Sequence, residues 1–481
     1  MSRTLAVDTR DVSGAGVLSL GRWGVVGGAL LIQMILGTVY AFSVLVEPFE
    51  SAFGWSRTQI TATASISLGV FAGTMVLAGG VLDRRGPRFT GLIGAGFLTA
   101  AFLAVSQMQS LAGMYVVHGI VTTGVAIALY LLIHAVTGGK RSPLADGLKI
   151  GVMIGVGVTS LLVAQTMIKG TASDSLWMFY LTYGFLGGAG IGFGYVAPVT
   201  ACVKWFPRHR GLITGIAVAG FGAGSMIFAP SARWAIDAVG WSSFFLVHGI
   251  VCAVGLTLGA LLLRNPSDDE KAHLGAVRHA AKEAGEETHW KDMLRTWKFW
   301  RLWVLFIFGA TAGLMTITQL KPFATLQGLT AAQGAAAIAV LAACNAAGRT
   351  LWGAASDRIG RSRSMAAMFA LQAVMMFGIN ALTGPTLFFV AAGWVGFNFG
   401  GIFALLPSAT ADTFGTRGLG TNYGIVFTGY GVAGIVGPIV GARVYDLTNS
   451  YAAAFTFAAI LCVAATFIAL FTGRTPREKA A

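Results

Sequence analysis

Long apolar runs alternate with short polar loops along most of the chain. Each run holds roughly 18 or more residues, which is enough to cross the ~30 Å hydrocarbon core of a bilayer as a helix. Spans are predicted at about residues 22–46, 60–81, 89–106, 112–137, 148–168, 177–203, 212–235, 242–263, 299–320, 331–354, 365–382, 386–406, 421–443 and 451–472. The pattern therefore predicts an all-α polytopic membrane protein with 14 transmembrane helices.

The order of loops and spans repeats once along the chain. The loop GGVLDRRGPR at residues 79–88 is matched by GAASDRIGRSRS at residues 353–364. The triplet RGL at residues 210–212 is likewise matched by RGL at residues 417–419. Loop and triplet lie 67 residues further apart in the first half, so we interpret residues 112–168 as an inserted helical hairpin. Repeated halves are typical of secondary transporters.

The repeat divides the chain into two transmembrane halves, residues 22–263 and 299–472. Residues 264–298 are charged and lack a spanning run, so we expect a cytoplasmic linker with one or two short surface helices. Residues 1–21 and 473–481 are expected to form cytoplasmic tails.

Charge and composition narrow the class of protein. A mean hydropathy of +0.73 is not that of a soluble domain. Most of the 33 Lys and Arg residues fall in loops on one side of the predicted membrane, so the net charge of +14 indicates orientation rather than a nucleic-acid partner. We expect a multi-pass protein of the plasma (bacterial inner) membrane, embedded in the lipid bilayer as a monomer, with both termini cytoplasmic.

Cysteine placement and motif content argue against an enzyme. The four cysteines lie in apolar spans without metal-ligand spacing, which favours buried apolar roles over disulfides or a metal site. The sequence contains no P-loop, H-E-x-x-H motif or nucleophile elbow. We expect no catalytic residues, no metal and no cofactor.

Both repeated loops carry an aspartate among arginines, in a G-x-x-x-D-R pattern. An aspartate can cap a helix end and pair with arginines, which would latch one face of the protein in one state. The alternative is a pair of basic loops that serve only topology. The candidate gating residues are Asp83, Arg84, Arg88, Asp357, Arg358 and Arg361.

One arginine, Arg349, lies inside a predicted span. A charge at such a depth costs roughly 2.5–3.5 kcal/mol on insertion scales, so it needs a polar partner or an anionic ligand. Asn345 precedes it by four residues and shares its helix face. The alternatives are that Arg349 pairs with helix-end carbonyls or snorkels to the cytoplasmic surface.

Several stretches resemble one transporter family. The loop motif is typical of the major facilitator superfamily when it lies between the second and third spans. Residues 36–56, 180–222 and 411–434 resemble the oxalate–formate antiporter family of that superfamily, which is related to the monocarboxylate transporters. The resemblance implies a major facilitator fold, with two six-helix halves around a central cavity for small carboxylates. It also makes Arg349 the residue that anchors the anion.

The resemblance also bears on the substrate. Oxalate transporters of the family carry a lysine at the position of Tyr430, and proton-coupled animal relatives carry an aspartate at the position of Asn345. Tyr40 and Tyr195 match aromatic cavity residues, and Asn398 is a weaker candidate of the same kind. Tyrosines at the membrane interface are the usual alternative. One cation suits a monoanion, so dicarboxylate transport is in doubt.

The expected function is secondary active transport of small monocarboxylates, of the formate, lactate or pyruvate type, by alternating access. The partner would be the carboxylate anion together with a counter-anion or a proton. An oxalate–formate antiporter is the alternative, and a carboxylate sensor that does not transport is a remote one.

Overall fold

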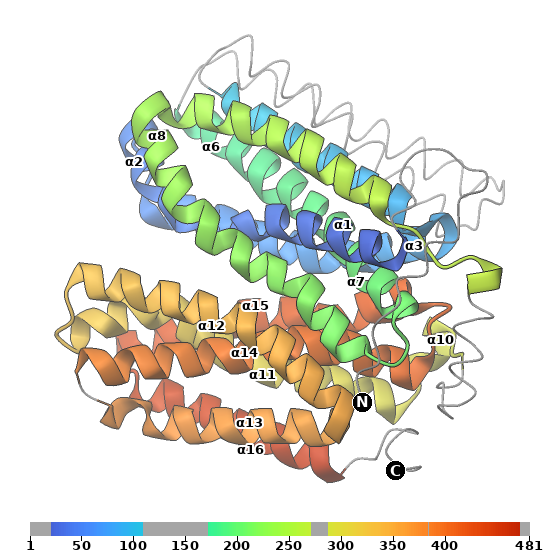
Figure 1. Cartoon of the computed structure of the whole chain (residues 1–481). Helices are drawn as coiled ribbons and strands as arrows, with labels where there is room; N and C mark the ends of the chain where they lie inside the picture. The colour runs from blue at the N-terminus through green and yellow to red at the C-terminus, as the bar shows by residue number, and fades with distance from the viewer. Residues whose placement is uncertain (1–20, 109–171, 271–286, 383, 472–481) are drawn as a thin grey trace, which may run out of the picture.

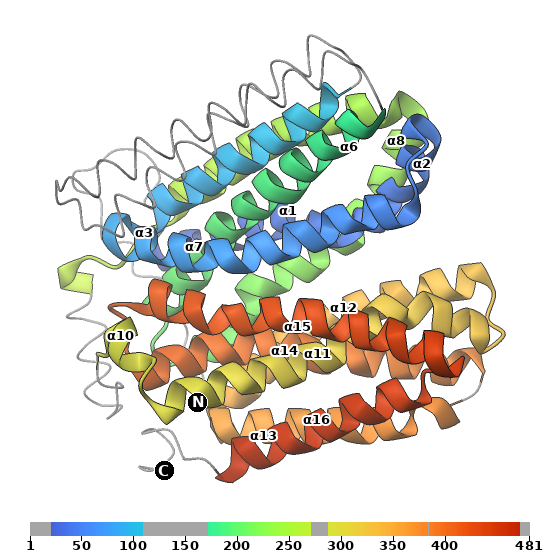
Figure 2. The ribbon, with the colours of Figure 1, turned by 180° about the vertical axis from the view of Figure 1, so that it is seen from behind.

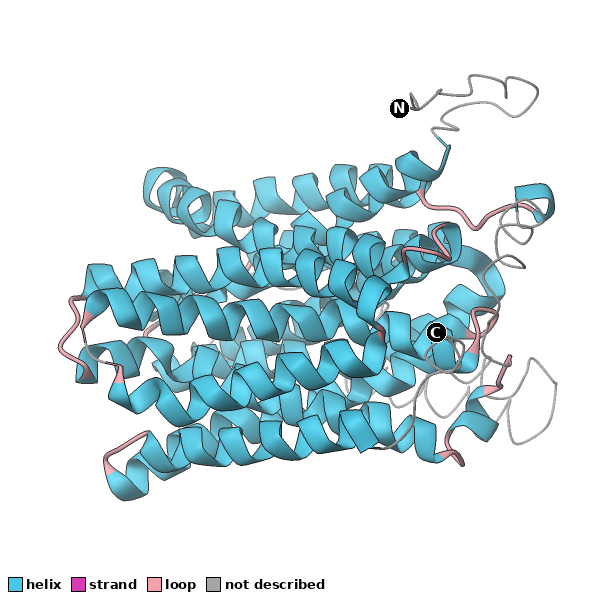
Figure 3. Ribbon diagram, turned by 60° about the horizontal axis from the view of Figure 1, so that its bottom comes forward, coloured by secondary structure: helices cyan, strands magenta, loops and turns pink. Residues whose placement is uncertain are grey.

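The computed structural model describes residues 21–108, 172–270, 287–382 and 384–471, and all regular structure in these ranges is helical (Figure 3). The first half contains α1 (Gly21–Leu36), η1 (Gly37–Leu45), α2 (Val46–Phe53), α3 (Arg57–Ser106), α6 (Ala172–Phe179), η2 (Tyr180–Gly187), α7 (Gly188–Trp205) and α8 (Arg210–Leu262). The second half contains α10 (Trp290–Met293), α11 (Trp297–Leu326), α12 (Ala331–Ile359), α13 (Arg361–Gly378), η3 (Ile379–Ala381), α14 (Pro385–Phe414), α15 (Leu419–Thr448) and α16 (Ala452–Phe471). The all-helical prediction is confirmed.

Within the described ranges, 10 helices are long and apolar enough to cross a membrane. Two of them, α3 and α8, hold 50 and 53 residues and are each interrupted by a non-helical glycine, Gly86 in α3 and Gly240 in α8. Each therefore covers two predicted spans. The hairpin predicted at residues 112–168 lies outside the described residues, so the total of 14 spans stays a prediction.

The helices form two bundles that meet face to face. In Figure 1 the first half, coloured blue to green, lies above the second half, coloured yellow to red, and Figure 2 shows the same arrangement from behind. Helices α3 and α8 of the first half contact α15 and α12 of the second half, respectively. We call the end of the bundles that carries the loops at residues 79–88 and 353–364 the predicted cytoplasmic face, and the opposite end the outer face.

Glycines bring the backbones of the two halves into direct contact. A Cβ atom on Gly215 of α8 would collide with the carbonyl oxygen of Arg349 on α12. On the other side of the interface, a Cβ on Gly424 of α15 would collide with the carbonyl oxygen of Met75 on α3. Small residues allow such close approach of membrane helices.

The repeat is present in the structure, with one correction to its register. Asp83 and Asp357 each bind the second and third residues of a helix in the other half, which are Gly420 and Thr421 of α15 or Gly211 and Leu212 of α8. The predicted match of residues 210–212 with 417–419 is therefore wrong by two residues. The reason is that α8 begins at the arginine of its RGL triplet, whereas α15 begins at the leucine of its own.

The halves are closed at the predicted cytoplasmic face and splayed at the outer face. On α3, the interface residues Met75 and Gly79 are buried, but Thr61, further out on the same helix face, is exposed. On α15, Gly424 is buried, whereas Ile435, three turns further from the predicted cytoplasmic face on the same side of the helix, is 61% exposed. The structure is therefore open towards the end that we call the outer face and closed at the opposite end.

Candidate functional site

Arg349 lies at the centre of the interface and is fully buried, with 0% of its surface exposed. Its Nε donates a 3.0 Å hydrogen bond to Oδ1 of Asn345, one turn earlier on α12. Its Nη1 donates a 2.8 Å hydrogen bond to the carbonyl oxygen of Val218 on α8, in the other half. The guanidinium also lies 4.7 Å from the ring centroid of Phe403 and 5.7 Å from that of Phe221. All four partners are neutral, so none of them balances the charge.

The third nitrogen of the Arg349 guanidinium, Nη2, has no hydrogen-bond partner among the described residues. Buried polar groups in native structures are nearly always paired, and an unpaired one marks a functional group or a missing ligand. Complete burial rules out snorkelling in this conformation. Arg349 therefore keeps one buried donor and an uncompensated positive charge that a small anion can satisfy.

Asn345 orients the arginine. Its Oδ1 accepts from Arg349, and its Nδ2 donates to the carbonyl oxygen of Gly396 on α14 at 3.2 Å. The bond between Arg349 and Asn345 confirms the prediction, made from their four-residue spacing, that the two side chains share one face of α12. Because both ends of the amide are engaged, Asn345 positions Arg349 here, and direct contact with a substrate stays a prediction.

Aromatic side chains from both halves surround this centre. The ring of Tyr195 on α7 lies 5.6 Å from Phe221 and 5.5 Å from Phe427. The ring of Tyr430 on α15 lies 5.2 Å from Phe427 and 5.3 Å from Phe403. Two predicted tyrosines, Tyr195 and Tyr430, are thus connected to Arg349 through the phenylalanines that flank its guanidinium.

A third tyrosine, Tyr423, belongs to the same cluster and was missed from the sequence. It is fully buried on α15, and its ring lies 5.8 Å from that of Phe427, which also contacts Tyr195 and Tyr430. Tyr423 precedes Tyr430 by seven residues, which is two helical turns, so the pair shares one helix face. That spacing was the available signal. Phe403 gave none, because a phenylalanine in an apolar span is unremarkable in sequence.

Two predicted site residues are not brought to Arg349 by the described contacts. Asn398 accepts from Nε1 of Trp352 at 3.1 Å and donates to Oε1 of Gln372 at 3.2 Å, so its amide faces α12 and α13 inside the second half. The backbone of Tyr40 lies in η1, but its side chain is outside the described residues. Their roles in binding stay predictions.

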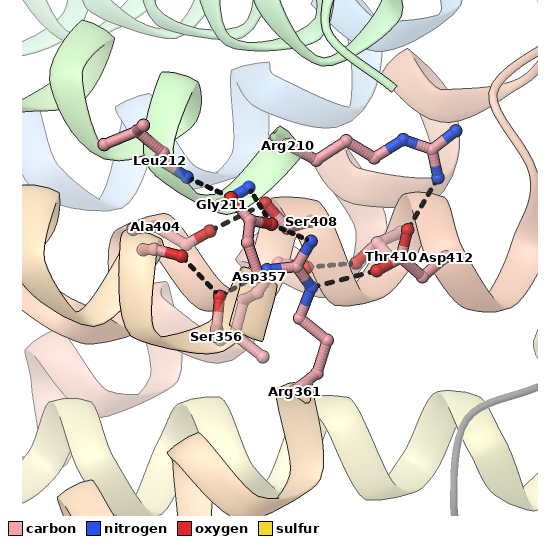
Figure 4. A network of polar contacts seen from close by, with 12 residues as sticks. Arg210, Gly211, Leu212, Ser356, Asp357, Arg361, Ala404, Ser408, Thr410 and Asp412 are labelled. Carbon is pink, nitrogen blue, oxygen red and sulfur yellow. Dashed lines mark hydrogen bonds and ion pairs between the residues drawn. The ribbon is translucent and has the colours of Figure 1, made fainter. Parts of the chain in front are cut away.

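Asp357 joins the halves at the predicted cytoplasmic face. Its two carboxylate oxygens accept hydrogen bonds of 3.0 and 2.8 Å from the backbone N–H groups of Gly211 and Leu212, in the first turn of α8. Arg361 makes a 2.8 Å ion pair with the same carboxylate. Figure 4 shows these contacts, which we call the Asp357 latch. A carboxylate at a helix N-terminus satisfies free amides and the positive end of the helix dipole.

A buried ion network extends the Asp357 latch. Nε of Arg361 donates to Asp412 at 2.9 Å, and Nη1 of Arg210 donates to the other oxygen of Asp412 at 2.6 Å (Figure 4). Arg210 belongs to the first half and Asp412 to the second, so this pair is a second bridge across the interface. The network holds two arginines and two aspartates and is formally neutral, as buried charges require. Arg361 was predicted here, whereas Arg210 and Asp412 were not.

The matching contact in the other pair of helices is the Asp83 latch. Among the described residues, no arginine donates a hydrogen bond to Asp83. Asp83 accepts bonds of 3.0 and 2.8 Å from the backbone N–H groups of Gly420 and Thr421, and one of 2.7 Å from the hydroxyl of Thr421. Arg84 and Arg88 are exposed, so the expected arginine pairing is not seen at this loop. Their guanidinium groups stay in water, where they avoid the free-energy cost of desolvating a charge. Arg358, the counterpart of Arg84, is also exposed.

Comparison with known proteins agrees with this geometry. The sequence model of the Major Facilitator Superfamily matches residues 122–379 and 328–481. The chain is 31% identical over 305 residues to an uncharacterized MFS-type transporter, YhjX, of Escherichia coli (strain K12), covering 62% of this chain and 70% of YhjX. It is 26% identical over 445 residues to the oxalate:formate antiporter of Oxalobacter formigenes, covering 92% and 89% of the two chains.

A solved structure shows the same fold. The proton:xylose symporter XylE superimposes with a TM-score of 0.64 at 12% sequence identity, covering 95% of this chain and 97% of XylE. The family match, the two packed helical halves and the membrane-length helices are consistent with one another. The chain belongs to the Major Facilitator Superfamily, a family of multi-pass membrane transporters.

Proposed function

We propose that this protein is a secondary active transporter of small monocarboxylates that works by alternating access. The observation that carries the proposal is Arg349, a fully buried guanidinium between the halves with an unpaired Nη2 and no acidic partner among its described contacts. A guanidinium binds a carboxylate with paired hydrogen bonds and remains charged at any physiological pH.

The surroundings of Arg349 favour a monoanion over a dianion. Phe403, Phe427 and Tyr430 are neutral and buried, and Tyr430 occupies the position where the resemblance places a lysine in oxalate transporters. One carboxylate would balance the single guanidinium. A second carboxylate would bring an uncompensated negative charge among aromatic rings, where burial of an unpaired charge is costly.

The transport cycle follows from the two latches. In this splayed shape, an anion would enter from the outer face and reach Arg349 once the side chains that bury it move aside, while the Asp83 and Asp357 latches hold the other face closed. Release on the predicted cytoplasmic side requires both carboxylates to leave the helix N-termini they cap. The bond from Arg349 to Val218 also crosses the interface, so it is exchanged when the halves rock.

An oxalate–formate antiporter is the second candidate, favoured by the 26% identity to the Oxalobacter formigenes protein over 92% of this chain. Uptake into proteoliposomes separates the two. A monocarboxylate transporter accumulates labelled formate, lactate or pyruvate, whereas the antiporter prefers oxalate and needs a substrate on the far side. A sensor would bind the anion without flux.

The test of the anchor is Arg349→Lys. We expect uptake to fall about a hundredfold although charge is kept, because the forked hydrogen bonds to Asn345, Val218 and the anion are lost. Wild-type uptake by this variant would remove Arg349 from the site.

Tyr430→Lys tests the argument from the number of cations. A second buried cation is expected to raise the ratio of oxalate to monocarboxylate uptake at least several-fold, since it would balance the second carboxylate. An unchanged ratio would remove the argument for a monoanion.

The orientation of the chain is a separate proposal. The basic loops favour a cytoplasmic location for both termini, with the protein in the plasma membrane. Labelling single cysteines at Arg141 and at the exposed Arg208, two residues before the buried Arg210, checks it from each side, and opposite accessibility of the two would contradict it.

A further inference from the structure

The end of the linker between the halves is bonded to the start of α15, beside the Asp83 latch. The two carboxylate oxygens of Glu287 accept hydrogen bonds of 3.2 and 2.9 Å from the backbone N–H groups of Thr416 and Arg417. The backbone N–H of Thr288 donates to Phe414 at 3.1 Å, and the side chain of Asn422 donates to the carbonyl of Thr288 at 3.0 Å. These four bonds hold the connection between α14 and α15 on both sides.

The backbone of the connection between α14 and α15 leaves room for the carboxylate of Glu287. Gly415 has a φ of +82°, and a Cβ at this position would collide with the carboxylate of Glu287. The bonded amides of Thr416 and Arg417 come only a few residues before those of Gly420 and Thr421, which bind Asp83. Glu287 therefore fixes the segment that leads into the first turn of α15, whose backbone N–H groups at Gly420 and Thr421 bind Asp83.

We infer that Glu287 is a positioning residue of the gate, which orders the first turn of α15 so that its amides are presented to Asp83. Glu287 lies in the linker, but its described hydrogen bonds go to the connection between α14 and α15 in the second half, so these bonds can persist while the halves move apart. The bonds of Glu287 pre-organise the first turn of α15. A turn that is already ordered loses less conformational entropy when the Asp83 latch closes. At the matching place in the Asp357 latch, the first residue of α8 is held instead by the Arg210–Asp412 ion pair.

The inference rests on the proposed gating but not on the identity of the substrate, and a distance measurement tests it without transport. Spin labels at Arg85 and Arg363, which are exposed at the predicted cytoplasmic face of opposite halves, report whether that face opens. We expect Glu287→Ala to raise the open population about fivefold, the effect of losing a helix-end cap. Glu287→Gln keeps one acceptor oxygen and should give a smaller rise.

A double-mutant cycle distinguishes positioning from general destabilisation. If Glu287 acts through Asp83, then Glu287→Ala should add nothing in an Asp83→Asn background. It should still add its full effect in an Asp357→Asn background. An equal rise in both backgrounds, or no rise in the wild type, would overturn the inference. If Asp83→Asn itself leaves the face closed, the proposed gate is wrong instead.

Two matched controls are available. Glu270→Ala removes a carboxylate of the same linker that binds Arg264 at 2.7 and 2.8 Å, and it should leave the open population unchanged. Gly415→Ala should displace the Glu287 carboxylate and open the face, whereas Gly384→Ala has a similar strained φ of +85° but meets no neighbour within 4 Å. Equal opening by the two glycine variants would contradict the role of Glu287.

Discussion

The Asp357 and Asp83 latches share one geometry and differ in what lies around them. Each carboxylate caps the second and third residues of a helix in the opposite half. Two turns further into the membrane on the same helices, however, the second half carries Arg349 and the first half carries Met75. The Asp357 latch also contains a buried ion network that the Asp83 latch lacks among its described contacts.

The shared and the unshared residues of the two halves suit two different tasks, which are the movement of the halves and the binding of the anion. Opening and closing need equivalent contacts on both sides of the interface, because both pairs of helices must separate together. A small anion has no need of two-fold symmetry, so a single guanidinium on one side is enough. On the proposed cycle, the residues shared by both halves would serve motion, and the residues that break the symmetry are the best candidates for ligand chemistry.

The strongest test of this assignment of roles moves the guanidinium of Arg349 to the equivalent position in the first half, which is Met75. In a Met75→Arg and Arg349→Met double variant, we expect uptake of monocarboxylate to fall at least about a hundredfold, as for a lost buried charge contact. The reason is that Phe71 stands where Asn345 would be needed, so the moved guanidinium has no amide to orient it. Uptake is measured in proteoliposomes with matched protein amounts. Recovery to wild-type levels would show that the symmetry extends to binding.

A smaller effect is expected from removing the two aspartates in turn. Asp357→Asn leaves Arg361 buried with one fewer charge partner and should destabilise the closed state by about 3 kcal/mol. Asp83→Asn loses a helix cap only and should cost about 1 kcal/mol. Thermal unfolding in detergent, together with the spin-label distances, provides the comparison. Equal losses would mean that the ion network contributes nothing to the latch.

The smallest effect concerns the linker. The hydrogen bond from Arg264 is the largest influence on Glu270 and lowers the pKa of its carboxyl to about 2. A lowered pKa in the folded state gives stability that is complete above the usual pKa of 4.5 and is lost as the pH falls towards 2. Because the pair is solvent-accessible, Glu270→Gln should cost under about 1 kcal/mol at pH 7.

The readout for Glu270 is the difference in unfolding temperature between wild type and variant across pH. The difference should be constant from pH 7 to about pH 5 and shrink below that. A difference that grows in acid would contradict the assigned contact, and a shift in latch opening would disqualify Glu270 as a control.

The candidate residues that were predicted from sequence share one property, which is a local signal. Arg349 is a charge in an apolar run, Asp83 and Asp357 lie in a repeated loop, and Asn345 is one turn from the arginine. The all-helical fold follows from the same kind of pattern. Arg210 and Asp412 are 202 residues apart, and only tertiary packing shows that they pair. The two-residue error in the repeat arose because sequence identity does not show where a helix begins.

Contact through Gly215 and Gly424 has a consequence for the speed of the cycle. Where backbones touch backbones, few side chains are immobilised when the halves close or released when they part. Each immobilised flexible side chain would cost roughly 0.5–1.5 kcal/mol of ordering. Backbone contact at these glycines thus keeps small the side-chain conformational entropy that is lost and regained in each cycle. This suits a carrier that must repeat the same motion for each molecule it moves.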